Sequence, residues 1–435
     1  MNLATLYRTQ GLAAVQAELA AQYPDVLAQL NSLGAAAPPP LLARAIVGAV
    51  CADDQDNAIA IAQRLFPSVP PLLPLRLAPM AALADYCRAR GLRHKVVLAP
   101  QLVKITPPSP YTMPFTYMTE AAIIASLPRA QYIPGWDVVI GEDNTLLRDS
   151  GYLPPDVATH AFLTFYINKL DCMIHYAPAE EVFVDEDVLF LSTPDNNVGH
   201  WMIDFLPRLK GLDYVPGGKA KVVVPLGMHG RYMEMLKAFG FGESDMVICD
   251  PRKRYRFRMC HFYRPGQATP PNPTHVQFVR DGFVGDRHLK IQPGKRVFLA
   301  RTQVGTRLVA NHEEFAAFLE AENIVSAELA DLTLEQQHEL LNDAEIILGT
   351  FGSNLFGMYL APPGCTILAL MNDLTEDVCV APTAHMLGMQ HEIFLCDRAP
   401  EAGVKRYKRD TNVTIDCAAL RERLAEIPGR YRVAT

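Results

Sequence analysis

The amino-acid sequence predicts an α/β protein with two Rossmann-like domains that face a cleft, preceded by a small helical N-terminal domain. Three observations support this fold class. The first 95 residues are rich in Ala and Leu, strand-like and helix-like patterns alternate in two later segments, and a Pro-rich stretch separates those segments. The predicted boundaries are 1–95 for the helical domain, 96–285 and 286–412 for the two Rossmann-like domains, and 413–435 for a C-terminal helix that packs back across them.

The composition excludes several classes of protein. The 435 residues are 49% hydrophobic and 20% charged, which is typical of a globular chain, and the net charge of -7 argues against a basic nucleic-acid-binding face. Nine cysteines without a CxxC pair favour reduced thiols in a cytosolic protein. The N-terminus has no apolar signal region, and no stretch approaches the roughly 20 apolar residues of a membrane span. We therefore expect a soluble, cytoplasmic protein.

Proline divides the N-terminal part of the chain. Three or four helical patterns in residues 1–95 are broken by the sequences APPP at 37–40 and PSVPPLLP at 67–74. Three strand-like runs follow, with the sequences KVVLAP, YIPGWDVVIGED and EVFVDEDVLFLS. This middle segment is therefore expected to be rich in β-structure.

From Leu206 onward the pattern alternates between strand and helix. KVVVPL and DMVICD are strand-like and flank the helical GRYMEMLKAFGF, and the Pro-rich HFYRPGQATPPNPTHVQF then favours a linker. Beyond it the order is RVFLAR, NHEEFAAFLEAEN, IVSAEL, TLEQQHELLNDA, EIILGT, GSNLFGMYL, TILALM and HEIFLCD. Continuous apolar strands between helices indicate a parallel sheet covered on both faces, and such sheets bind ligands beyond the carboxyl ends of their strands.

One short run, DNNVGHWMIDFLPRLKGL, carries polar residues in an apolar setting. If it is helical, His200, Asp204 and Arg208 share one stripe at four-residue spacing, and Pro207 kinks or ends the regular helix. The remaining residues are apolar, so the helix should be buried and its charges should need partners. Two interpretations follow from the spacing: an Asp204–Arg208 pair with a core histidine, or a stripe that faces a cleft.

The segment NNVGHWMIDFLPRL resembles the signature of glycosyltransferase family 61, which reads Asn, an aromatic, any residue, His-Trp-Leu, then Asp, then Leu-Pro-Arg-Leu. Two later segments are similar to the family in the same order. They are FLARTQVGTRLVANHEEF and ADLTLEQQHELLNDAEIILGTFGSNLFGMYLAPPGCTILAL. The resemblance covers roughly residues 100 to 400 and leaves the helical first 95 residues outside.

The resemblance implies an inverting, metal-independent glycosyltransferase of the two-domain GT-B type, active in bacterial polysaccharide (exopolysaccharide or capsule) synthesis. Its donor would be a nucleotide-sugar, expected to be a UDP-sugar, and its acceptor a glycan or lipid-linked glycan. The segment 96–285 would be the acceptor-side domain and 286–412 the donor domain. No cofactor beyond the donor and no nucleic-acid partner is expected.

The resemblance also implies which residues are catalytic. Transfer passes through an oxocarbenium-like state and needs a base for the acceptor hydroxyl. We expect Asp204 to be this base with His200 in support, and the reverse assignment stays open. Asn197, Trp201 and Arg208 match the motif as acceptor-side or supporting residues.

On the donor side, two arginines and a strand-to-helix turn are candidates for binding the diphosphate. Arg301 ends the strand RVFLA and Arg307 follows in its loop, and guanidinium groups suit phosphate oxygens. The turn after EIILG offers backbone N–H groups to phosphate. The expected donor-binding residues are Arg301, Arg307, Gln337, Gly349, Phe351, Gly352, Ser353 and Asn354.

The donor turn departs from the family pattern. Phe351 replaces a His, and Ser353-Asn354 replaces Ala-Gly. Because Phe cannot donate a hydrogen bond whereas the Asn354 amide can, we expect an altered donor preference. Two alternatives stay open: Phe351 fills core volume, or the chain is a non-catalytic carbohydrate- or nucleotide-binding relative.

The sequence also contains two charged runs, one acidic and one basic. Asp185-Glu186-Asp187 could be mistaken for a metal-binding triad, but apolar runs flank it and we interpret it as a solvated hairpin turn. The basic run Arg252–Arg258 is either an exposed loop or edge strand, or a peripheral contact to an anionic membrane at its inner face.

Overall fold

The structure is a computed structural model. It describes residues 3–65, 74–105, 115–134, 139–148, 165–166, 172–191, 197–228, 230–250, 252–266, 270–302, 305–375, 377–399 and 411–431. Within these residues no helix has both the length and the apolar character needed to cross a bilayer.

Three helices form the N-terminal part, α1 (Leu3–Leu33), α2 (Pro39–Cys51) and α3 (Gln55–Leu65). Their apolar faces form one buried cluster, which also includes side chains of β1 (Leu75–Ala81) and β9 (Cys172–Tyr176). The helical region therefore ends earlier than the predicted residue 95, because β1 pairs with β9 in a small sheet and only the short α4 (Leu83–Ala89) follows it.

The first half of the chain that follows the N-terminal helices contains a seven-stranded mixed sheet. Its strands follow the order β12-β11-β10-β13-β5-β2, with β6 paired to β13. The first four strands are parallel, and β5 and β2 add antiparallel to β13. The bounds are β2 (His94–Leu98), β5 (Ala122–Pro128), β6 (Gln131–Tyr132), β10 (Glu181–Phe190), β11 (Lys221–Pro225), β12 (Met246–Cys249) and β13 (Arg254–Arg264).

The second half contains a five-stranded parallel sheet in the order β15-β14-β16-β17-β18. This confirms the strand–helix alternation predicted from the sequence. The bounds are β14 (Arg296–Leu299), α8 (His312–Ala321), β15 (Val325–Ala327), α9 (Leu334–Leu341), β16 (Ile346–Thr350), the 3-10 helix η8 (Ser353–Leu360), β17 (Thr366–Met371), α10 (Val380–Met386), β18 (Gln390–Leu395) and α11 (Cys417–Tyr431).

Smaller elements connect these sheets. The Pro-rich segment is shorter than predicted, because the residues HFYR form the end of β13 and the helix α7 (Pro273–Val284) begins soon after. The other elements are β3 (Leu102–Ile105), β4 (Phe115–Met118), β7 (Leu146–Leu147), β8 (Phe165–Tyr166), α6 (Gly230–Ala238), β19 (Asp397–Arg398) and β20 (Val413–Thr414).

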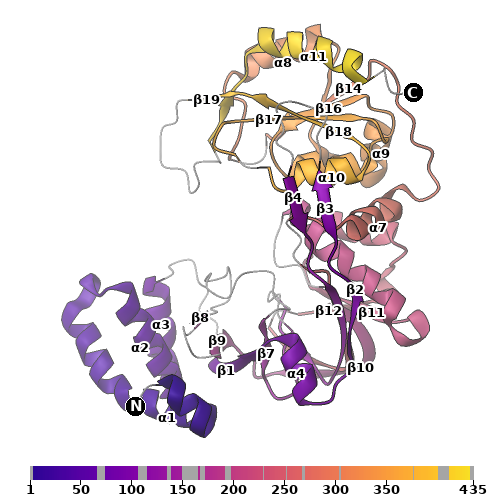
Figure 1. The fold of residues 1–435 in the computed structure, drawn as a ribbon. Helices are drawn as coiled ribbons and strands as arrows, with labels where there is room; N and C mark the ends of the chain where they lie inside the picture. Colours follow the sequence, from indigo (N-terminus) through magenta and orange to yellow (C-terminus); the bar gives the residue numbers. More distant parts are fainter. Residues whose placement is uncertain are drawn as a thin grey trace.

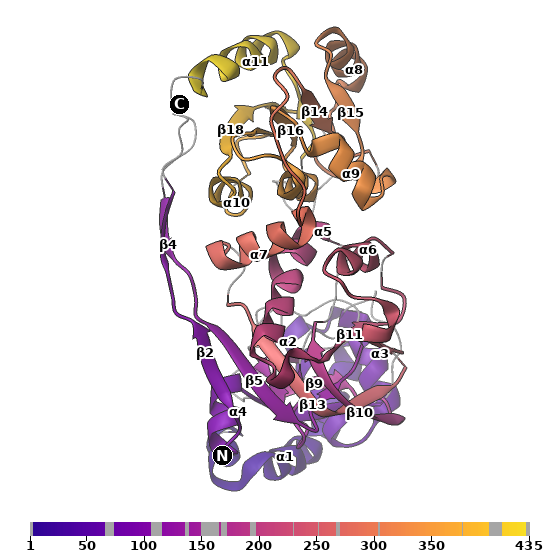
Figure 2. The ribbon, with the colours of Figure 1, turned by 90° about the vertical axis from the view of Figure 1, so that its right-hand side faces the viewer.

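The two sheets share a buried apolar cluster. It joins residues of β10 and β11 in the first half to inner-face residues of β14, β16 and β17 in the second, through the helical segment 198–214, α6, α7, η8 and α10. Figures 1 and 2 show α7 lying between the two sheets. An apolar contact of this kind favours a fixed arrangement of the halves.

The outer face of the second sheet is covered by α8 and α11, at the top of Figure 1. Leu420, Leu424 and Ile427 of α11 are buried against this sheet, and Arg423 pairs with the buried Glu392 of β18. The prediction that the C-terminal helix packs back across both domains is therefore wrong for the described residues, because the apolar stripe of α11 is used on its own domain.

Candidate functional site

A helical segment that begins at Asn197 presents the predicted catalytic residues at the contact between the halves. It consists of one α-turn, α5 (Val198–His200), a π-helical turn, η3 (Trp201–Phe205), and a 3-10 stretch, η4 (Leu206–Tyr214). The Leu206 N–H donates to Trp201 O, five residues back, and Pro207 has no N–H to continue an α-helical ladder. The expected interruption at Pro207 is thus present, and π-turns of this kind are frequent at functional sites.

His200 and Asp204 form a dyad on this segment. His200 Nδ1 lies 2.8 Å from Asp204 Oδ2. The His200 side chain is 32% exposed and that of Asp204 only 10%, so the histidine is the outer member. A ring whose Nδ1–H donates to a carboxylate carries its basic lone pair on Nε2.

Asp204 sits in a strongly desolvating environment. Burial raises the pKa of its carboxyl, while the hydrogen bond to His200 and the charges of His200 and Arg208 act in the opposite direction. The ionised form of Asp204 is therefore favoured by the hydrogen bond to His200 and by the charge of Arg208. Arg208 thus acts on Asp204 through its charge, and the His200 side chain, at 32% exposed, is not a core histidine.

Trp201 and Arg208 hold the segment in the first half. Trp201 is 1% exposed and stacks on Tyr232 of α6 at a centroid distance of 4.7 Å. Arg208 is also buried, donates to Leu191 O at 3.0 Å and lies over the Phe205 ring. The structure therefore gives both residues supporting contacts within the motif.

Asn197 joins the two halves of the site. Its Oδ1 accepts hydrogen bonds from the backbone N–H groups of Gly199 at 2.9 Å and His200 at 3.3 Å, which caps the helical segment. The same oxygen accepts from Ser353 Oγ at 2.8 Å, across the contact between the halves. Gly199 allows this approach, since a Cβ there would lie 3.1 Å from the ring of Phe356 in η8.

The predicted donor residues meet where β14 and β16 end. A Cβ on Gly352 would overlap the Arg301 guanidinium, so the glycine lets this arginine lie on the turn. Arg307 donates from Nη1 to Phe351 O at 2.9 Å and has a φ of +57°. Such backbone conformations are uncommon outside glycine and concentrate at functional sites.

The rest of the turn is held by its own contacts. Asn354 Nδ2 donates to Leu299 O at 2.8 Å, and Gly349 leaves room for this amide. The Phe351 side chain is half-buried against the shared apolar cluster. Gln337, by contrast, is 3% exposed and donates to the carbonyls of Leu329 and Leu332, so its amide serves the local chain path.

Sequence reasoning missed the segment before α10. Burial and Asp377 raise the pKa of the Cys379 thiol to about 12, Asp204 adds to this shift, and Arg307 opposes it. The thiol therefore lies within electrostatic range of both the dyad and the donor side. Asp377 orders the segment by accepting from the N–H groups of Val380 and Ala381 and pairing with His391 at 3.0 Å. The sequence NDLTEDVCVAP gave no signal of this role.

A small cavity in the described part of the chain lies on another side of the helical segment. Its lining includes Met202, Pro207, Asn272, His275 and Tyr359, and neither dyad residue contributes to it. It is therefore distinct from the region between the dyad and the donor turn, where the polar groups converge.

The acidic run was predicted as a hairpin turn, and this is wrong. Asp185, Glu186 and Asp187 lie inside strand β10, where neighbouring strands supply cations. Glu186 pairs with Lys221 at 2.8 Å, and Asp187 with Arg258 at 2.9 Å. In the described residues no group of three or more His, Cys, Asp or Glu side chains is arranged to hold a metal ion.

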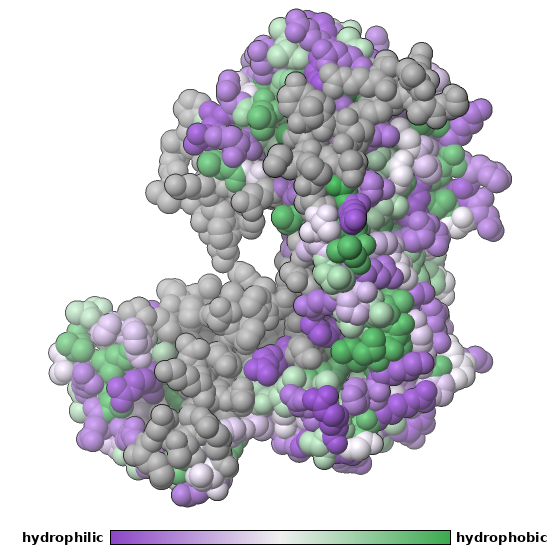
Figure 3. Space-filling view, viewed as in Figure 1, coloured by the Kyte–Doolittle hydropathy of each residue, from purple (hydrophilic) through white to green (hydrophobic). Residues whose placement is uncertain are grey.

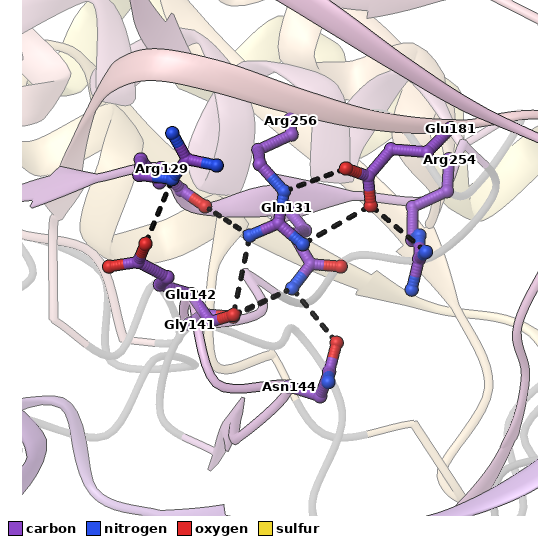
Figure 4. Close-up of polar contacts among 8 residues, drawn as sticks. All are labelled: Arg129, Gln131, Gly141, Glu142, Asn144, Glu181, Arg254 and Arg256. Atoms are coloured by element: carbon purple, nitrogen blue, oxygen red, sulfur yellow. Dashed lines mark hydrogen bonds and ion pairs between the residues drawn. The ribbon is translucent and has the colours of Figure 1, made fainter.

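The basic run is also neutralised. Glu181 accepts from Arg254 at 2.9 Å and from Arg256 at 2.9 and 3.1 Å, and Arg256 also donates to Arg129 O (Figure 4). The remaining cations pair as Arg252 with Asp250, Lys253 with Glu180, and Arg258 with Asp187. All five cations of the run therefore have acidic partners, and the membrane contact through this run stays a prediction.

Comparison with known proteins adds to this geometry. Residues 198–368 match the sequence profile of the family described as Glycosyltransferase 61, and the match spans both the dyad and the donor turn. No curated protein matches the chain. The site and the matched segment thus define a glycosyltransferase. Residues 198–368 thus carry the sequence profile of glycosyltransferase family 61, as the motifs predicted.

Proposed function

We propose that the protein is an inverting, metal-independent transferase of the GT-B type, with the helical N-terminal region as an added part. It moves a sugar from a nucleotide-sugar, in our expectation a UDP-sugar, to a glycan or lipid-linked glycan acceptor in bacterial polysaccharide synthesis. The observation that carries the proposal is the meeting of the His200–Asp204 dyad with the Arg301–Arg307 pair across one contact, tied by Asn197 and Ser353.

Strand order supports this location. The second sheet has the order 2-1-3-4-5, counted along the chain, and its switch point lies between β14 and β16. Arg301 follows one of these strands and Phe351 the other. In the first sheet β12-β11-β10-β13 has the order 3-2-1-4, and the dyad segment follows β10 at its switch point. Open α/β sheets bind ligands at such points.

The dyad geometry favours His200 as the base, with Asp204 orienting the ring and stabilising its charge. The acceptor oxygen forms a bond to the anomeric carbon while the bond from this carbon to the diphosphate oxygen breaks. The acceptor proton passes to His200 Nε2, and the electron pair leaves with the diphosphate. Arg301 and Arg307 stabilise the charge that develops there.

The donor turn departs from the family pattern, and we propose that this changes which sugar is accepted. Phe351 offers an apolar ring partly covered by the shared cluster, and Asn354 offers an amide whose Oδ1 has no hydrogen-bond partner in the described structure. The alternative, a relative that binds a nucleotide without transfer, retains the arginines but predicts no turnover.

Binding and turnover are measured on the same sample. Thermal-shift screening against a panel of nucleotide-sugars should show one preferred donor, with about 2.7 kcal/mol of stabilisation at 100 times the dissociation constant. Transfer with that donor should persist in EDTA. Binding without transfer to any acceptor would favour the non-catalytic alternative. Activity that vanishes in EDTA and returns with manganese would contradict the metal-independent mechanism.

A further inference from the structure

A two-stranded arm runs along one side of the molecule. It is formed by β2 and β3 on one strand path and by β4 and β5 on the other, and the Thr119 N–H donates to Gln101 O between the two paired regions. Figure 2 shows this arm extending from the first sheet toward the second half. Tyr117 on the arm donates to Pro271 O at 2.6 Å, which fixes it to the segment before α7.

The outer surface of the arm is apolar. Val96, Leu102 and Met118 are 54%, 57% and 59% exposed, and Leu102 lies directly opposite Met118 in the β3–β4 pair. Ala99 and Pro100, between β2 and β3, are exposed as well. Figure 3 shows hydrophobic surface on this side of the molecule, over the region of β2. Edge strands are normally protected, so an exposed apolar edge calls for a partner.

Cations border this apolar surface. Arg93, Lys95 and Lys104 are exposed, and within the described part of the chain none of them forms an ion pair. Arg88 and Arg90 nearby are instead paired with acidic residues. The whole chain carries a net charge of -7, so this local excess of positive charge is not a property of the surface in general.

The charges select among partners. A second copy docked through the same arm in a two-fold arrangement would bring three cations against their own counterparts, and like charges that face each other are destabilising. An anionic lipid bilayer has an apolar interior and negatively charged headgroups, so it matches both the apolar side chains and the cations of the arm. The basic run 252–258 does not combine these two features, because its cations are paired with acidic residues.

We propose that the outer surface of this arm, formed by Leu102 and Met118 with Arg93, Lys95 and Lys104, docks the protein on an anionic lipid bilayer. The apolar side chains enter the headgroup region while the three cations contact lipid phosphates. This interaction surface stands independently of the transferase mechanism, because it can be measured without turnover. If the proposed function also holds, the arm keeps the reaction site near a lipid-linked acceptor.

Vesicle sedimentation of the full chain tests the surface. The chain should bind vesicles of phosphatidylcholine with about one third phosphatidylglycerol and not phosphatidylcholine alone, and added salt should weaken the binding. Lys95→Glu with Lys104→Glu should reduce binding about tenfold or more. Leu102→Gln with Met118→Gln should also reduce it, since the apolar contact is lost.

Matched controls come from other exposed sites. Lys219→Glu with Lys237→Glu changes the same net charge elsewhere, and Leu226→Gln with Ile248→Gln removes side chains that are 57% and 48% exposed. These controls should bind like the wild type, and unchanged melting temperatures establish that the variants fold. Equal loss in the controls, or no binding to either vesicle, overturns the proposal. A concentration-dependent dimer abolished by Leu102→Gln with Met118→Gln would also overturn it and identify the arm as a contact between copies.

Discussion

The two halves of the site are built by different means. In the first half, the dyad sits on a helical segment whose apolar residues are embedded in the shared core, and Trp201 and Arg208 fix it there. In the second half, the proposed donor groups lie on loops at strand ends, and their contacts include hydrogen bonds to backbone carbonyls, such as Arg307 to Phe351 O. The proposed catalytic dyad is therefore preorganised by packing, whereas the proposed donor groups are positioned by local hydrogen bonds.

This difference has consequences for mutation. A substitution in the dyad should lower kcat, the rate of transfer in the bound complex, because the apolar core that positions the segment is unchanged. A change in the donor loops should affect donor binding, because little else holds the nucleotide there. Asn197 is the exception, since its one oxygen caps the dyad segment and accepts from Ser353 in the donor turn.

His200→Gln gives the largest expected effect. Glutamine fills similar space but cannot take the acceptor proton, so kcat should fall by about 10²–10⁴. The donor dissociation constant, measured by calorimetry, should stay within a factor of about three because the base contributes to the transition state. Lys210→Met is the control from the same segment: it removes a cation that pairs with the exposed Asp213, so kcat should stay near the wild-type value. Near-normal transfer by the His200→Gln variant would show that His200 is not the base.

Arg307→Ala and Arg301→Ala test the other half. Each should raise the donor KM by about 10–100-fold, the range expected when a charge-assisted hydrogen bond to phosphate is lost. Arg421→Ala is the matched control, because this arginine lies in the same half and pairs with Glu322 on the outer face. If kcat falls while donor binding is unchanged, the arginines stabilise the departing diphosphate and not the bound donor.

The sequence predicted the second half well and the first half less well. Strands β14 to β18 are continuous apolar runs separated by helices, so their pairing follows local order. In the first sheet, β13 pairs with β10 and with β5, partners more than 60 residues away along the chain, and nothing in the local pattern specifies them. The same long-range pairing explains the error at Asp185–Asp187, because Asp185 and Asp187 pair with Arg258 across β10 and β13.

The site was predictable where a motif carried it. His200, Asp204, Arg301 and Arg307 were named from the sequence, and the structure brings the first two into a dyad. The role of Asn197 as a bridge depends on Ser353, more than 150 residues later, and could not follow from either segment alone. Cys379 and Asp377 carry no motif and are recognised only from their position beside the dyad and Arg307.

Asp204→Asn tests how much the burial of the Asp204 carboxylate lowers the free energy of unfolding, and its expected effect is the smallest. Burial raises the folded-state pKa of Asp204, so its ionised form costs stability at pH values above both the unfolded and folded pKa values. Asparagine has no charge to desolvate and can still accept from His200 Nδ1. The variant should therefore be as stable as the wild type or more stable, by about 0.5–2 kcal/mol, near pH 8. This advantage should shrink as the pH falls through the raised pKa, because the wild-type carboxyl then takes up a proton and loses the desolvation penalty.

Urea denaturation at about pH 8 and about pH 5 measures the difference in stability between the variant and the wild type at each pH. Asp213→Asn, on the same segment but exposed and paired with Lys210, is the control for the loss of a carboxylate outside the core. A variant that is less stable at the higher pH would mean that the ionised carboxyl is stabilised by His200 and Arg208 more than burial penalises it.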